Sequence, residues 1–89
     1  MEERKEIKVI KVGLPGFPFV VFRHTLEEVL KYYSLRGAKV LPSGDLFYEV
    51  HHPRTKTLYL WESTVFEDEY EFVEEEVPGL PFKLVYAYC

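Results

Sequence analysis

The chain has 89 residues, of which 47% are hydrophobic and 17% aromatic, so it suits one domain with one core and does not fit the intrinsically disordered class. Its lone cysteine, Cys89, excludes an internal disulfide and a cysteine-rich zinc scaffold. The formal net charge of −4 is unevenly distributed along the chain, which suggests that one surface is acidic and another basic.

Two strands are predicted near the N-terminus. Residues 7–12 (IKVIKV) are β-branched apart from two lysines, and the later run FVVF is apolar throughout and of strand length. Between them lies P-G-F-P-F, residues 15–19, which recurs as P-G-L-P-F at residues 78–82. Because Pro-Gly pairs favour turns, we expect each copy to end one element and to start a core strand, with Phe19 and Phe82 as buried first residues.

An amphipathic helix is predicted for residues 26–36. Thr25 and Glu28 have the spacing of a capping box, and the apolar residues that follow recur at the i, i+3, i+4, i+7 spacing of one helical face. Gly37 is placed to end this helix, since glycine readily adopts the left-handed conformation that follows many helices.

The middle of the chain predicts strands joined by tight turns. Residues 38–41 (AKVL) indicate a short strand and residues 42–45 (PSGD) a turn. Strands over residues 46–51 and 57–61 then form a hairpin, whose tip lies in the segment HHPRTK because Pro53 cannot donate a hydrogen bond to a ladder.

The segment 63–77 is open to two interpretations. Thr64 with Glu67 makes a second capping box, and apolar residues follow at helical spacing with acids around them. As a strand, the segment would place Tyr70 and Phe72 on one face and would pair with the last apolar run, FKLVYAY. We predict a helix, because a run of acids suits a solvated helical face better than a paired strand.

In chain order the predicted elements are β-β-α-β-β-β-α-β. This order predicts a single α+β domain over residues 1–89, with a mainly antiparallel sheet of about five to six strands and one or two helices covering one face.

The C-terminal part of the chain is strongly acidic. Residues 1–56 hold ten lysines or arginines and seven acids, whereas residues 57–89 hold one basic residue and eight acids. The acidic run contains no cation for i, i+4 pairs, and Phe72 falls off the apolar stripe of the predicted helix. We therefore predict a docking surface for a macromolecule, and the acidic charge favours a basic protein as the partner. The alternative interpretation is a solvated face that keeps the protein soluble. The predicted partner-binding residues are Glu67, Asp68, Glu69, Glu71, Phe72, Glu74, Glu75 and Glu76.

A second hypothesis is a nucleic-acid-binding module, regulatory in role, that uses the hairpin tip. A protruding hairpin with positive side chains can follow phosphates, and Tyr48 or Tyr59 nearby can stack on a base. The residues of this alternative are His51, His52, Arg54 and Lys56, with Arg4, Lys5, Lys8 and Lys11 as further phosphate contacts.

No catalytic, cofactor or metal site is predicted. The serines lack a G-x-S-x-G setting, and adjacent histidines such as His51 and His52 point to opposite faces of a strand. Cys89 stands at the end of the sequence, where little can hold its thiol in place. We expect a non-enzymatic protein.

Composition also indicates a source, a location and an assembly. The sequence has no Asn and no Gln, which is typical of proteins from hot-living organisms, and we expect a thermophilic archaeon or a virus of one. No apolar run approaches about 20 residues, and the first residues, MEERKE, lack the pattern of a signal peptide, which predicts a cytoplasmic protein. Seven Tyr and seven Phe exceed what one small core holds, which favours a homodimer.

Overall fold

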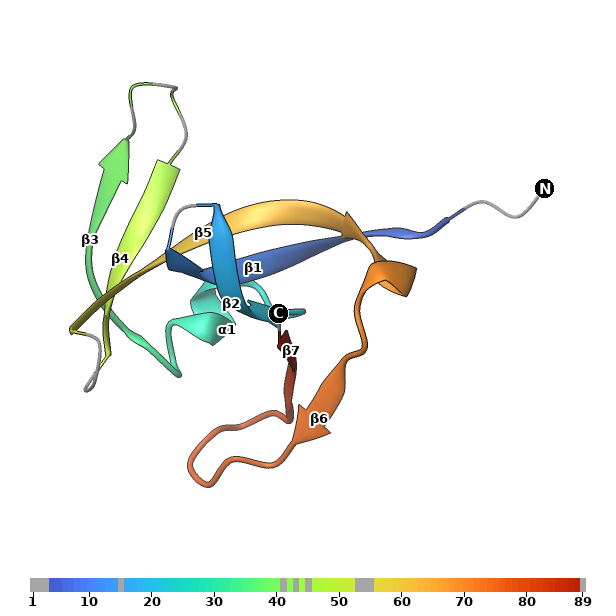
Figure 1. Ribbon diagram of the computed structural model, residues 1–89. Helices are drawn as coiled ribbons and strands as arrows, with labels where there is room; N and C mark the ends of the chain where they lie inside the picture. The colour runs from blue at the N-terminus through green and yellow to red at the C-terminus, as the bar shows by residue number, and fades with distance from the viewer. Residues whose placement is uncertain are drawn as a thin grey trace.

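One antiparallel sheet of seven strands forms the body of the molecule (Figure 1). The computed structural model describes residues 4–14, 16–40, 42, 44, 46–52 and 56–88, without the side chains of residues 34–36, 39, 52 and 56. Across the sheet the strand order is β3-β4-β5-β1-β2-β7-β6. The strand bounds are β1 Glu6–Leu14, β2 Phe17–Phe22, β3 Ser34–Val40, β4 Leu46–His52, β5 Lys56–Phe66, β6 Val73–Glu75 and β7 Leu84–Tyr88.

The centre of the sheet is the pair β1 and β5. The two strands pair continuously from Glu6 opposite Phe66 to Gly13 opposite Tyr59. β-Branched and aromatic residues dominate this ladder, as expected for a central pair with side chains packed on both faces. The predicted strands near the N-terminus, the central hairpin strands and the last apolar run are confirmed as β1, β2, β4, β5 and β7.

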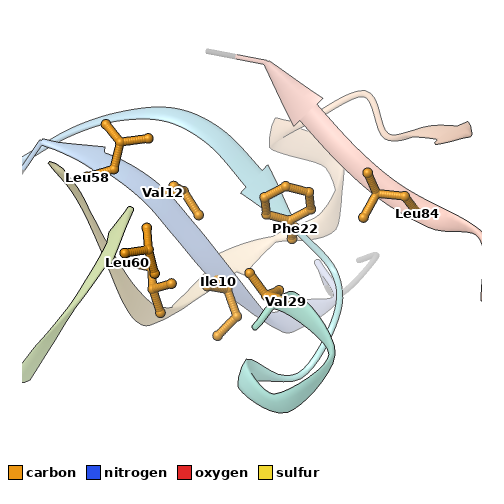
Figure 2. Packing of buried hydrophobic residues seen from close by; sticks show 8 residues of the cluster. Ile10, Val12, Phe22, Val29, Leu58, Leu60 and Leu84 are labelled. Atoms are coloured by element: carbon orange, nitrogen blue, oxygen red, sulfur yellow. The ribbon is translucent and has the colours of Figure 1, made fainter. Parts of the chain in front are cut away.

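The larger core lies on the face of the sheet that carries the short helix α1, Leu26–Val29, and we call it the α1 face. Alternate residues of three adjacent strands point here, because side chains along a strand alternate between faces. Ile10, Phe22 and Leu60 from these strands pack with Val29 of α1, each with at most 3% of its surface exposed (Figure 2). This cluster is the main source of hydrophobic stabilisation.

His24 ties β7 to the start of α1. Its Nε2 accepts a hydrogen bond from the Val85 N–H at 2.7 Å, and its Nδ1 lies 3.2 Å from a carboxylate oxygen of Glu28. A neutral imidazole with its proton on Nδ1 satisfies both contacts. His24 is therefore a structural residue of the fold.

The opposite face, which we call the Trp61 face, has a smaller core. Val9, Val21 and Val65 are buried there, and Tyr70 and Phe72 pack against them. These aromatics belong to the segment that leads from β5 to β6 at the far edge of the sheet. The segment therefore crosses this face and covers one end of it.

The structure corrects the predicted helix over residues 26–36. The capping box of Thr25 and Glu28 is present, but α1 ends at Val29 and Ser34 already begins β3. The chain turns because Tyr32 and Tyr33 pack their rings 5.9 and 6.0 Å from the Phe22 ring, which a continued helix would not allow for both. Gly37 lies inside β3, opposite Glu49 of β4.

The helix predicted within the segment 63–77 is also wrong. β5 continues to Phe66, a single 3-10 turn, η1, spans Glu67–Glu69, and β6 pairs with β7. The pairing of Thr64 and Val65 with β1 buries Val65 in the sheet, whereas an isolated acidic helix would gain no such burial and would be only marginally stable. With helix confined to α1 and η1 among the described residues, the fold is closer to all-β than to the predicted α+β class.

The two P-G-x-P-F segments have different environments. They lie at opposite ends of β7, since the first precedes the part of β2 that pairs with the end of β7 and the second precedes the start of β7. Gly16 and Gly79 have φ of 80° and 91°, which confirms a turn in each copy. Phe82 packs against the α1-face core, but Phe19 is 47% exposed, so the prediction of a buried Phe19 is wrong.

Candidate functional site

The acidic residues predicted to bind a partner divide into an anchored group and a free group. The anchored group lies in η1, where Arg4 contacts two acids. The Arg4 guanidinium lies 3.0–3.2 Å from the Asp68 carboxylate and 3.2 Å from Glu69, and 3.9 Å from the centroid of the Phe66 ring. The pairing of β1 with β5 brings this cation to the acids from the other end of the chain.

Glu67 is anchored by two further cations. Its carboxylate lies 3.6 Å from Lys5 Nζ and 3.4 Å from an Arg23 nitrogen, and its N–H donates to the Lys5 carbonyl at 2.8 Å. Arg23 also lies 5.2 Å from the centroid of the Phe72 ring. Phe72 is therefore half-buried between Arg23 and the valines of the Trp61 face, although its place off the apolar stripe of the predicted helix would have left it exposed.

The contact with Arg4 lowers the pKa of Asp68, chiefly through the side-chain hydrogen bond. A carboxyl whose pKa is lowered by folding contributes stability above its ordinary pKa, and this contribution is lost as the pH falls through the lowered value. In an Arg4→Gln variant we expect the pKa of Asp68 to rise towards its ordinary value, measured by NMR titration of the side-chain carboxyl carbon. Lys5→Gln, which removes a cation that pairs with Glu67 instead, should leave it low. An unchanged Asp68 pKa in Arg4→Gln would contradict the contact.

The free group consists of Glu71, Glu74 and Glu76. All three side chains are exposed, and within the described residues none of them forms an ion pair. They lie in and around β6, the edge strand of the sheet. Glu75 of the same strand accepts a 2.8 Å hydrogen bond from the Tyr86 hydroxyl, which raises the pKa of Tyr86. The unneutralised charge of the acidic run is thus concentrated at one sheet edge.

The residues of the alternative nucleic-acid site are only partly described. His51 is exposed on the Trp61 face of β4, and His52 pairs with Lys56 at the end of the ladder. Arg54, with the rest of the hairpin tip at residues 53–55, lies outside the described residues, as do the side chains of His52 and Lys56.

The N-terminal cations do not gather on one surface. Arg4 and Lys5 are engaged by the acids of η1. Lys8 and Lys11 are three residues apart in β1, and side chains at that spacing point to opposite faces of a strand. Lys8 therefore lies on the α1 face and Lys11 on the Trp61 face. Only Lys11 is placed to act together with His51.

Sequence reasoning missed an aromatic cluster on the Trp61 face. The Phe47 ring lies 5.1 Å from the Trp61 ring and 6.4 Å from the Tyr59 ring, and Lys11 pairs across the ladder from Trp61. The alternation of Tyr59 and Trp61 in β5 was the available signal, because residues two apart in a strand share a face. The pairing with Phe47 and Lys11 depends on the strand register.

Neither the family models, nor the curated proteins, nor the solved structures include a match to this chain. Within the described part of the chain, no helix is both long enough and apolar enough to cross a membrane.

Proposed function

We propose that this protein is a small, non-enzymatic interaction protein of a thermophile that binds a basic segment of another protein in the cytoplasm. The binding surface comprises β6 and the free acids Glu71, Glu74 and Glu76. The observation that supports this proposal is that these exposed carboxylates, unlike those of η1, have no cation beside them within the described residues.

The contrast with η1 supports a role in binding. The chain neutralises Glu67, Asp68 and Glu69 with three of its own cations, so its basic residues are used where the fold needs them. Like charges close together on β6 repel one another, and a basic partner would relieve that repulsion. The acids would also speed the encounter with a cationic partner, because complementary fields raise association rates.

The shape of the edge favours an extended partner segment. Val73, which begins β6, is 49% exposed and offers an apolar contact next to the acids. A segment that alternates cationic and apolar residues would match both features, since side chains in a strand alternate in direction.

A direct test uses a fluorescently labelled peptide of alternating lysine and valine, titrated with the protein and followed by anisotropy at low and moderate salt. In a Glu74→Gln/Glu76→Gln variant we expect the affinity to fall about tenfold, because two exposed ion pairs at up to about 1 kcal/mol each are lost. Added salt should weaken binding to the original protein.

The matched control is Glu6→Gln/Glu27→Gln, which removes the same charge from exposed positions away from β6. This variant should bind the peptide nearly as well as the original protein. Equal losses in the two variants would show that only net charge matters, and absence of peptide binding would refute the proposal.

A second candidate function, binding of single-stranded nucleic acid, is favoured by the aromatic cluster on the Trp61 face. Tyr59 and Trp61 are partly exposed there with Lys11 beside them, which is the combination of stacking surface and cation that such proteins use. The same titration with labelled DNA and RNA oligonucleotides tests it. Salt-sensitive binding that Lys11→Glu weakens, and that Glu74→Gln/Glu76→Gln does not, would favour this face over β6.

A further inference from the structure

The central strand β5 has an open edge over half of its length. On one side it pairs with β1 from Tyr59 to Phe66, but on the other side it pairs with β4 only from Lys56 to Leu60. Residues 61–66 therefore pair with no strand on the β4 side among the described residues, although Leu46 and Phe47 of β4 still line a cleft with Trp61 and Glu62. Figure 1 shows why, since the β3–β4 hairpin rises away from β5.

The hydrogen-bond pattern shows which main-chain groups face this open edge. In an antiparallel pair, residues alternate between exchanging hydrogen bonds with the partner and pointing their N–H and C=O groups away from it. The Glu67 N–H donates to the Lys5 carbonyl of β1 at 2.8 Å, so Glu67 points towards β1. Glu62, Thr64 and Phe66 alternate with the residues that bond to β1. Their N–H and C=O groups therefore point away from β1, towards the open edge.

A cleft marks the place where β4 leaves β5. Its volume is about 490 Å³, and it is lined by Leu46, Phe47, Tyr48, Trp61 and Glu62. Leu46 is 44% exposed, so the cleft has an apolar wall open to solvent. Glu62, which forms no ion pair within the described residues, adds one negative charge.

We infer that this edge pairs with the same edge of a second copy of the chain, in antiparallel orientation, with the two-fold axis at Thr64. Only residues 62, 64 and 66 point their N–H and C=O groups outwards, so only these residues can form hydrogen-bonded pairs with the second copy. With the two-fold axis at Thr64, this residue lies opposite the partner's Thr64, and Glu62 lies opposite the partner's Phe66. Both open stretches are then used almost completely, and the two edges form one continuous sheet.

Charge and shape agree with this register. Arg4 lies over the Phe66 ring, so the partner's Phe66 would bring the partner's Arg4 close to Glu62. The partner's Phe66 would also lie at the mouth of the cleft, beside Leu46, because Phe66, Glu62 and Leu46 point to the same face. Each contact occurs twice by symmetry.

The two outer edges of the sheet are less suitable for pairing between copies. β6 is three residues long and carries acids, and β3 is interrupted by an irregularity between Leu35 and Gly37. A second copy paired at β6 would place acids against acids, and an irregular edge such as β3 resists pairing. The open stretch of β5 contains a single charged residue, Glu62, over residues 61–66.

The axis position allows a charge-swap test by light scattering coupled to size exclusion. The original protein should elute at twice the monomer mass. Thr64→Lys and Thr64→Glu should each be monomeric, because like charges would face each other across the axis, and an equimolar mixture of the two should be dimeric again. Thr64 is exposed, so both variants should fold, which circular dichroism checks.

An unmodified protein that stays monomeric at high concentration, two variants that remain dimeric, or a mixture that stays monomeric would each overturn the inference. Hydrogen exchange followed by NMR tests the same pairing without mutation. The amides of Glu62, Thr64 and Phe66 should gain protection as the protein concentration rises, whereas that of Ser63, which already bonds to β1, should not change. Concentration-independent exchange at Thr64 would count against the dimer.

Discussion

Phe22→Ala is expected to destabilise the protein by about 3–5 kcal/mol, the usual cost of deleting a buried phenylalanine ring. Phe22 is 1% exposed, and its ring lies within 6.3 Å of the rings of Tyr32, Tyr33 and Tyr86. The contacts with Tyr32 and Tyr33 hold the turn after α1, so the truncation would leave a cavity and also loosen that turn. Urea unfolding followed by circular dichroism measures the loss.

Phe17→Ala is the matched control, because it makes the same chemical change in the same strand. Phe17 is 73% exposed, so the substitution should change the free energy of unfolding by no more than about 0.5 kcal/mol. Similar losses in the two variants would mean that the packing around Phe22 is not the main core of the protein.

The strands were predictable from sequence because their signal is local. Alternating or continuous apolar runs such as residues 7–12 are typical of strands, and the structure has them in the sheet. The prediction of a helix over residues 26–36 was wrong because the spacing of its apolar residues fits a second structure equally well. That structure is a short helix followed by a turn that places Tyr33 on Phe22. What decided between them was the pairing of β3 with β4, the next strand along the chain, because a helix that continued to residue 36 would prevent that pairing.

The candidate site was predictable in composition and not in arrangement. The acids of residues 67–76 could be listed from the sequence, but their neutralisation by Arg4, Lys5 and Arg23 depends on contacts between residues more than forty positions apart. The i, i+4 rule applies within one helix and therefore overlooked these pairs. Only the structure separates Glu74 and Glu76 from the anchored acids of η1.

Gly13→Ala is the second substitution expected to have a large effect. Gly13 lies at the irregularity of the β1–β2 ladder, where a Cβ would come within 2.6 Å of the Phe17 carbonyl oxygen and 2.7 Å of the Phe19 nitrogen. These are main-chain atoms, so relief requires the two strands to move apart. We expect a loss of about 1–3 kcal/mol, as for other overpacked sites, measured by urea unfolding.

Gly37→Ala separates this steric cost from the general effect of replacing a glycine in a strand. Gly37 also lies beside a register irregularity, in β3, but a Cβ there would meet no atom within 4 Å. Because alanine restricts the unfolded chain, this variant should be neutral or more stable by up to about 1 kcal/mol. If both variants lose stability equally, the cause is the loss of glycine itself, and the close approach of β1 to β2 at Gly13 is not what requires this residue.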